Sequence, residues 1–177
     1  MATTLNSKDV SGNKSTTVKN GSAFIICLLI PLAVGALSGY ITHGEMMGWW
    51  FMNLNKPVFN PPNGVFGPVW TLLYCLMGVS LYLVWKSPKT RLRRNAIFVF
   101  SLQLFLNFWW SILFFSFHLL FVSIIDISIM WILILYMIIL FRKTKPNAGY
   151  INIPYLMWVS FATVLNISIW VLNSTII

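Results

Sequence analysis

The amino-acid sequence predicts an all-α membrane protein, a bundle of five transmembrane helices. Of its 177 residues, 58% are hydrophobic and only 8% are charged, which is too apolar for the core of one soluble domain of this length. Five stretches are long and apolar enough to cross a hydrocarbon layer of roughly 30 Å as helices. None shows the period-two alternation that is typical of a membrane β-barrel.

Each predicted span is a run of about 20 mostly apolar residues. The runs are Phe24–Thr42, Phe66–Trp85, Ala96–Phe117, Leu119–Phe141 and Ile153–Ile176. The residues before them are polar and offer nothing with which to build a core. We therefore expect a flexible tail over residues 1–23 and one transmembrane domain over residues 24–177.

Positive charges predict which loops share a side of the membrane. Eleven of the twelve Lys and Arg residues lie before the first run, between the second and third, or between the fourth and fifth; Lys56 is the exception. The positive-inside rule then places the N-terminus inside and the C-terminus outside. Basic loops beside anionic lipid headgroups account for the net charge of +9, so no nucleic-acid partner is expected.

Three spans carry aromatic and polar residues on one helical face, at steps of three and four. These stripes are Trp70, Tyr74 and Met77 in the second span; Gln103, Asn107, Trp110 and Phe114 in the third; and Trp158, Ala162 and Leu165 in the fifth. Such stripes are typical either of helix contacts, with amides bonded across the bundle, or of the walls of a ligand cavity. Asp126, the only acid within a span, needs a partner or water on either interpretation.

The first loop, His43–Val65, is too long for a simple connection. Its prolines stiffen it, and Trp49 and Trp50 give it an apolar underside. We interpret the loop as a lid over a cavity between the helices, with Lys56 available to an anionic ligand group.

Motifs of soluble enzymes are missing from the sequence. It holds no nucleotide-binding loop, nucleophile elbow or carboxylate pair. His43 and His118 have no second ligand at metal spacing, so no metal site is expected. Cys27 and Cys75 fall inside spans, which indicates apolar packing.

A series of short motifs runs through the first loop and all five spans. They include His43-Gly44-Glu45, Lys56-Pro57, Pro61-Pro62, Gly67-Pro68-Val69-Trp70, Met77-Gly78, Tyr82-Leu83-Val84-Trp85-Lys86, Leu106-Asn107, Phe114-Phe115, Asp126, Pro154-Tyr155-Leu156, Trp158, Phe161-Ala162-Thr163 and Leu165-Asn166. In these motifs and their spacing, over roughly residues 28 to 172, the chain resembles the translocator protein family, also called tryptophan-rich sensory proteins or peripheral benzodiazepine receptors.

The resemblance implies a five-helix bundle, commonly a homodimer, with a cavity beneath the first loop. It implies that this cavity binds porphyrins such as protoporphyrin IX and haem, sterols, and isoquinoline or benzodiazepine drugs, with no required cofactor. The positions that match family cavity positions are Trp50, Phe66, Trp70, Asn107, Asp126, Trp158, Ala162 and Leu165, and Phe51 stands where the family usually has Tyr. Trp110 joins them because it lies on the same stripe as Asn107.

Three activities follow as alternatives from the resemblance. The first is a receptor or carrier that serves tetrapyrrole or sterol transport, scavenging or a stress response. The second is light-dependent porphyrin degradation, in which Trp70 and Trp158 match the tryptophans thought to take part. The third is a structural bundle without a ligand. The fifth span departs from the family's sterol motif, a weak pattern in any case, because it lacks both the Tyr and the basic residue.

Location and assembly rest on the same resemblance. The animal-like motif at His43 and the Lys86 end of the second span favour the mitochondrial outer membrane over a bacterial or other organellar membrane. The resemblance implies the topology of mitochondrial members, with the C-terminus in the cytosol, and the charge rule was framed for membranes entered by the general export route. Gly35 and Gly39 form a small-xxx-small pair that suits a close helix contact, within one chain or between two.

Overall fold

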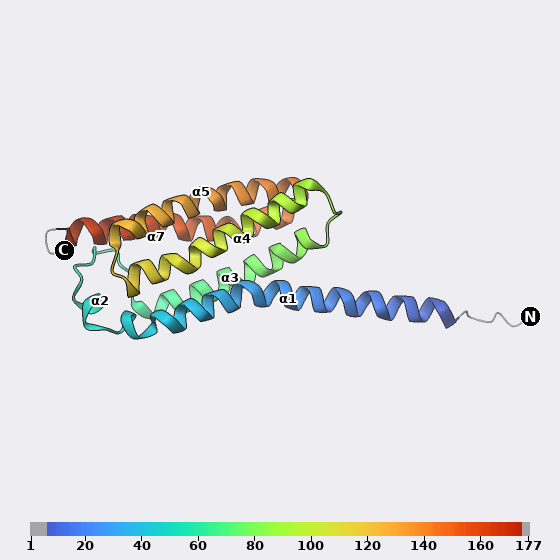
Figure 1. The fold of residues 1–177 in the computed structure, drawn as a ribbon, viewed down its shortest axis with the longest axis horizontal. Coiled ribbons are helices and arrows are strands. Elements are labelled where there is room, and N and C mark those ends of the chain that lie inside the picture. The colour runs from blue at the N-terminus through green and yellow to red at the C-terminus, as the bar shows by residue number, and fades with distance from the viewer. Residues whose placement is uncertain (1–6, 175–177) are drawn as a thin grey trace, which may run out of the picture.

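The fold is that of a computed structural model, which describes the backbone of residues 7–174 and the side chains of residues 21–174. Within that part of the chain every regular element is a helix (Figure 1). The elements are α1 (Ser7–Met46), α2 (Trp49–Asn53), α3 (Asn63–Trp85), α4 (Arg91–Ser111), the π-helical segment η1 (Ile112–Ser116), α5 (Leu120–Thr144), α6 (Pro146–Tyr150) and α7 (Ile153–Asn173).

In the described part of the chain, five helical segments are long and apolar enough to span a membrane, which confirms the predicted fold class. The first of these spans is Gly21–Met46, the later part of α1. The division of the chain after residue 23 stays a prediction, and residues 1–6 and Ile176 lie outside the described backbone.

The helix ends differ from the predicted bounds at the basic loops. α4 begins at Arg91 rather than Ala96, because the Thr90 hydroxyl caps it by accepting a hydrogen bond from the Arg93 N–H at 3.1 Å. α5 continues to Thr144, with Arg142 and Lys143 in its last turn, where positive charge suits the helix dipole. The end turns of these helices are polar, so hydropathy alone predicts helices that are too short.

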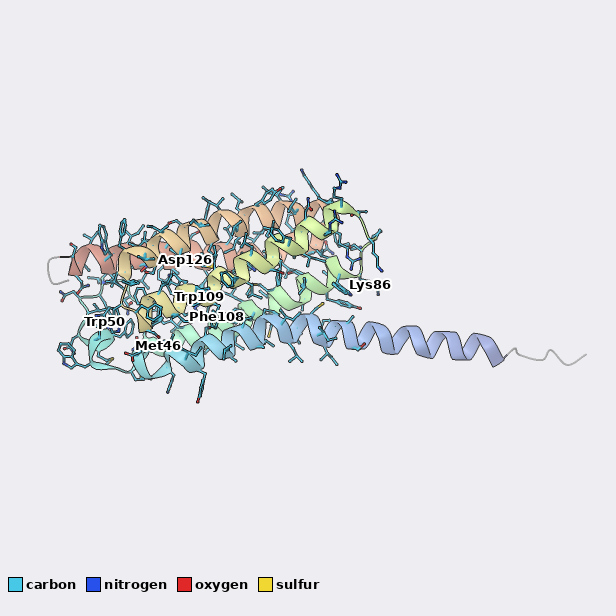
Figure 2. All side chains as sticks on the ribbon, in the orientation of Figure 1. Met46, Trp50, Lys86, Phe108, Trp109 and Asp126 are labelled. Atoms are coloured by element: carbon cyan, nitrogen blue, oxygen red, sulfur yellow. The ribbon has the colours of Figure 1, made fainter. Side chains whose placement is uncertain are left out.

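The long helices run lengthwise and reverse at two opposite ends (Figure 1). One end carries the α1–α3 loop with α2, the α4–α5 connection and the end of α7. The other end carries the basic loops between α3 and α4 and after α5. In Figure 2, Trp50 and Asp126 lie toward the first end and Lys86 lies at the second. The arrangement agrees with the predicted sidedness of the loops.

Two glycines set the close approach of α1 and α3. A Cβ built on Gly78 would lie 2.6 Å from Leu28 Cα, so only hydrogen fits between the two backbones there. Gly35 faces the ring of Tyr74, which lies where a Cβ would point. The Gly35 half of the small-xxx-small pair therefore packs within the chain, while Gly39 faces open space.

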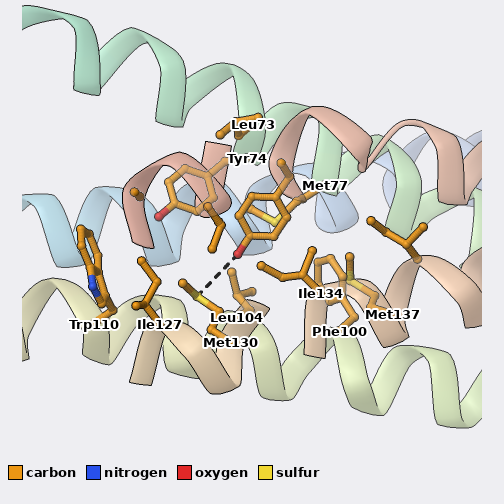
Figure 3. Packing of buried hydrophobic residues seen from close by; sticks show 14 of the residues in the cluster. Leu73, Tyr74, Met77, Phe100, Leu104, Trp110, Ile127, Met130, Ile134 and Met137 are labelled. Carbon is orange, nitrogen blue, oxygen red and sulfur yellow. Dashed lines mark hydrogen bonds between the residues drawn. The ribbon is translucent and has the colours of Figure 1, made fainter. Parts of the chain in front are cut away.

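The core is apolar and rich in Met, Leu, Ile and Phe (Figure 3). A polar network lies inside it, with the Tyr155 hydroxyl at the centre. That hydroxyl donates to Gln103 Oε1 at 2.8 Å and accepts from Asn107 Nδ2 at 3.3 Å. The Tyr74 hydroxyl donates to Asn107 Oδ1 at 2.6 Å. The network joins α3, α4 and α7 across the bundle.

Candidate functional site

A cavity lies beneath the first loop, between α3, the α4–η1 region and α7. Seven of the sequence-predicted residues line it: Phe51, Phe66, Trp70, Trp110, Trp158, Ala162 and Leu165. Its free volume is only about 30 Å³. Sites for small organic ligands are usually about 300–1,000 Å³, so the predicted walls meet around a cavity that their own side chains nearly fill.

A second, larger cavity adjoins the first on the side of α1. Its volume is about 470 Å³, and Gly35, Gly39 and Tyr74 contribute to its walls. Phe66, Trp70, Trp110 and Phe115 line both cavities. These four aromatic side chains are therefore the partition between the small central cavity and the larger lateral one.

Two indole N–H groups of the central cavity lack hydrogen-bond partners. Trp110 Nε1 and Trp158 Nε1 are both buried, and neither finds an acceptor among the described residues. An indole N–H can only donate, and burying it unpaired is costly. Two residues of the cavity wall thus carry N–H donors that no described residue uses.

The stripe on the third span divides between two roles. Gln103 and Asn107 belong to the polar network, so the helix-contact interpretation holds for them. Trp110 and Phe114 line the central cavity. The structure thus places Asn107, 1% exposed and bonded through both ends of its amide, outside the cavity walls.

Two other predicted residues also stand apart from the cavity lining. Asp126 is 9% exposed on α5, and its Oδ2 has no hydrogen-bond partner in the described part of the chain. Trp50, on α2, stacks on the His118 ring with centroids 3.9 Å apart and planes 16° from parallel. This stacking holds the first loop against the connection between η1 and α5.

The first loop is fastened to the bundle by aromatic contacts and hydrogen bonds. Phe51 is buried and meets the rings of Phe114 and Phe115 edge-on. Toward α7, the Asn173 amide bonds both the N–H and the carbonyl oxygen of Asn55, each at 3.0 Å. These contacts hold the loop in place over the cavity, and we call the loop the lid.

Lys56 lies within this lid. Its Nζ donates to the Phe51 carbonyl oxygen at 2.6 Å and stands 4.3 Å from the centre of the Phe51 ring. Partial removal from water lowers the pKa of the Lys56 ammonium group from its ordinary value. The charge has no carboxylate partner among the described residues.

The helical stripe of the third span includes Phe114 but does not indicate Phe115 as a cavity wall. Phe114 and Phe115 are adjacent, yet both reach the cavity because η1 widens the helix there, with the Phe117 N–H bonded to the carbonyl of Ile112. No local pattern signals that π-helical turn. Asn166 and Ile169 also line the cavity, and they lie four residues after Ala162 and Leu165. Helical spacing in the sequence is therefore enough to indicate these two walls.

Comparisons with known proteins show the family of the chain. The sequence profile of the TspO/MBR family matches residues 27–171. The chain is 36% identical to a tryptophan-rich protein TspO of Chlorobaculum tepidum over 152 residues, which is 84% of this chain and 94% of that protein. It is 37% identical to a tryptophan-rich protein TspO of Archaeoglobus fulgidus over 151 residues, 85% of this chain and 96% of that protein.

An animal relative shows the same relationship. The chain is 32% identical to the Homo sapiens translocator protein over 130 residues, which cover 72% of this chain and 76% of that protein. The matches span the lid and all five membrane helices. This chain is therefore an integral, multi-pass membrane protein that belongs to the TspO/MBR family.

Proposed function

We propose that this protein is a membrane receptor or carrier that binds porphyrins, such as protoporphyrin IX and haem, in the cavity beneath the first loop. The observation that carries the proposal is the meeting of Trp70, Trp110 and Trp158 around one cavity, two of them with unpaired indole N–H groups. A flat apolar macrocycle stacks well on indole faces, and its polar edge needs only a few donors.

The central cavity must widen to admit a macrocycle. The partition of Phe66, Trp70, Trp110 and Phe115 is the part that would move, because the lateral cavity behind it already has about 470 Å³. Outward rotation of these side chains joins the two spaces into one of ordinary ligand-site size. Binding on this account is an induced opening between α1 and α3.

Lys56 supports a ligand that carries carboxylates. Its ammonium group lies in the lid, above a cavity whose wall includes Phe51, the residue that it contacts. The two propionates of a porphyrin would emerge at the lid end, where Lys56 can pair with one of them. In this pose the apolar rings face the Trp cluster.

A first experiment blocks the cavity. Titration of the purified protein with protoporphyrin IX should quench Trp fluorescence to saturation. Ala162→Phe fills the cavity, since Ala162 is 6% exposed on its wall, and should weaken binding at least tenfold. Val164→Phe is the matched control, because Val164 is 54% exposed on the same helix. Unchanged binding by the Ala162 variant would place the ligand elsewhere.

A second experiment tests the role of Lys56 through the ligand. Lys56→Gln should weaken protoporphyrin IX binding by roughly fivefold to tenfold and leave the binding of its dimethyl ester unaltered, because the ester has no carboxylate to pair. Lys86→Gln, at the opposite end of the bundle, should alter neither affinity. Equal losses for acid and ester would remove the proposed ion pair.

Light-dependent porphyrin degradation is the second candidate, and one observation favours it. Trp70 lies against three other oxidisable rings, with centroids 5.6 Å from Tyr74, 6.2 Å from Tyr155 and 6.5 Å from Trp110. Electrons can pass from such rings to an excited macrocycle, with dissolved oxygen as the oxidant. Illumination in air should then bleach the Soret band, and Trp70→Phe should slow that bleaching while Trp49→Phe does not. Recovery of intact porphyrin would eliminate this activity.

The remaining proposals rest on the family. We propose that sterols and isoquinoline or benzodiazepine drugs, which are also flat and apolar, compete for the same cavity. We propose a homodimer and a place in the mitochondrial outer membrane, although the relatives include bacterial and archaeal proteins. Displacement of protoporphyrin IX, crosslinking in membranes and organelle fractionation test these three proposals in turn.

A further inference from the structure

A long apolar groove follows the outer surface of the bundle between α1 and α4. Its volume is about 660 Å³, and its walls include Ile26, Ile30, Phe105, Phe108 and Trp109, with Leu81 of α3 also lining it. Phe108 and Trp109 stand on the α4 side (Figure 2). Several wall residues are strongly exposed, Ile26 at 58% and Phe105 at 58%, so the groove is open to lipid.

The length of the groove matches one leaflet of a bilayer. It follows α4 from Ile97 to Trp109, which is roughly 18 Å of helix at 1.5 Å per residue. Half of the hydrocarbon layer is about 15 Å. The groove therefore accommodates an acyl chain lying along the membrane normal within the leaflet of the basic loops.

A basic pocket of about 540 Å³ continues the groove at the end of the α3–α4 loop. Trp85 and Ile97 line both spaces, so they are contiguous. The rest of the basic pocket is formed by Lys89, Thr90, Arg91, Arg93 and Arg94. No carboxylate contributes to this lining, and the two acids whose side chains are described, Glu45 and Asp126, belong to other parts of the bundle.

Arg93 is the residue that marks the pocket as a binding site. It is only 8% exposed, its guanidinium carbon lies 5.0 Å from the centre of the Trp85 ring, and its Nε has no hydrogen-bond partner among the described residues. A buried N–H of a guanidinium normally donates to an acceptor, because leaving it unpaired is costly, and an anion is the strongest acceptor for it. The stacking on Trp85 holds the charge at the junction of pocket and groove.

We propose that the groove and the basic pocket together bind one anionic phospholipid, with its phosphate against Arg93 and one acyl chain between α1 and α4. The phosphate supplies the missing partner of Arg93, and Lys89 and Arg94 add attraction for a headgroup with net negative charge. The acyl chain covers the exposed wall of α1 and α4. This site is separate from the cavity beneath the lid, and it does not depend on porphyrin binding.

The test compares lipids bound to the full-length protein in detergent by native mass spectrometry. The wild-type protein should retain one dioleoylphosphatidylglycerol in preference to dioleoylphosphatidylcholine. Arg93→Gln should reduce that affinity roughly tenfold, whereas Arg142→Gln should not. Arg142 is a matched control because it also stacks on an aromatic ring, that of Tyr150 at 4.8 Å, but at the other basic loop.

A second pair of variants tests the groove without touching the charge. Ser101 is an exposed residue of the groove, so Ser101→Phe should block the acyl chain and lower phosphatidylglycerol affinity severalfold. Ile132→Phe, on the exposed face of α5, should have no effect. Thermal unfolding of each variant separates loss of binding from loss of the fold.

Several outcomes would overturn the proposal. Equal losses in the Arg93 and Arg142 variants would mean general attraction to basic loops rather than a site. Competition by inorganic phosphate at the concentration of the lipid would mean a headgroup pocket without a role for the groove. A change of oligomeric state in the Ser101 variant, with lipid binding intact, would assign the groove to a second copy of the chain.

Discussion

The Asn173 side chain at the end of α7 binds the backbone of Asn55 through two hydrogen bonds of 3.0 Å, across 118 positions of the sequence. Its oxygen accepts from the Asn55 N–H and its amide nitrogen donates to the Asn55 carbonyl oxygen. The last turn of the bundle thereby holds the lid over the cavity.

Asn173→Ala should remove both hydrogen bonds and let the lid open more often. The loss of two hydrogen bonds at about 1 kcal/mol each corresponds to roughly 30-fold more frequent opening of the lid. Hydrogen exchange of the backbone amides in residues 54–60 measures the opening. Ser174→Ala, which removes only a local bond to the Val171 carbonyl, is the control. Identical exchange in the two variants would mean that the lid is held by its aromatic contacts alone.

Tyr155→Phe should destabilise the bundle by about 1–3 kcal/mol. The Tyr155 hydroxyl bonds both Gln103 and Asn107, and each of these side chains is at most 1% exposed. Removing the hydroxyl leaves a buried polar group on each of them without this partner. Thermal unfolding in detergent measures the effect. Tyr150→Phe is the comparison, since Tyr150 is 50% exposed. A stable Tyr155 variant would indicate that water enters the core and replaces the hydroxyl.

Gly78→Ala should lower stability by roughly 1–3 kcal/mol, because the new methyl group would press on the backbone of α1 at Leu28. Gly39→Ala should be close to neutral, because nothing lies within 4 Å of the Cβ that it would add. The two unfolding midpoints, measured side by side, give the difference. Similar midpoints would mean that α1 shifts freely on α3.

His118 connects helix α5 to η1 with a left-handed backbone, φ being 56°. Substitution by Gly and by Val both remove the stacking on Trp50, so the comparison of the two variants no longer contains that contact. His118→Val should be less stable than His118→Gly by about 1–2 kcal/mol, because a β-branched residue resists this conformation. Denaturant unfolding monitored by circular dichroism measures both.

The sequence predicts the framework because hydropathy and helical spacing are local properties. The five spans and the inward faces of Trp110 and Ala162 follow from counting residues. The stacking of Trp50 on His118 does not follow, because it joins residues 68 positions apart and His118 has a left-handed backbone that no glycine signals. The small volume of the central cavity does not follow either, since it depends on side-chain rotamers, which residue spacing does not predict.

The π-helical turn at η1 acts as a one-residue insertion in an otherwise regular helix. Upstream of it, α4 keeps Gln103 and Asn107 in register with Tyr155. Downstream, the extra residue rotates the chain so that Phe114 and Phe115 both face the cavity. Trp110 keeps the register of the polar network and the two Phe side chains take the shifted one, so a single helix supplies walls to the cavity in two registers.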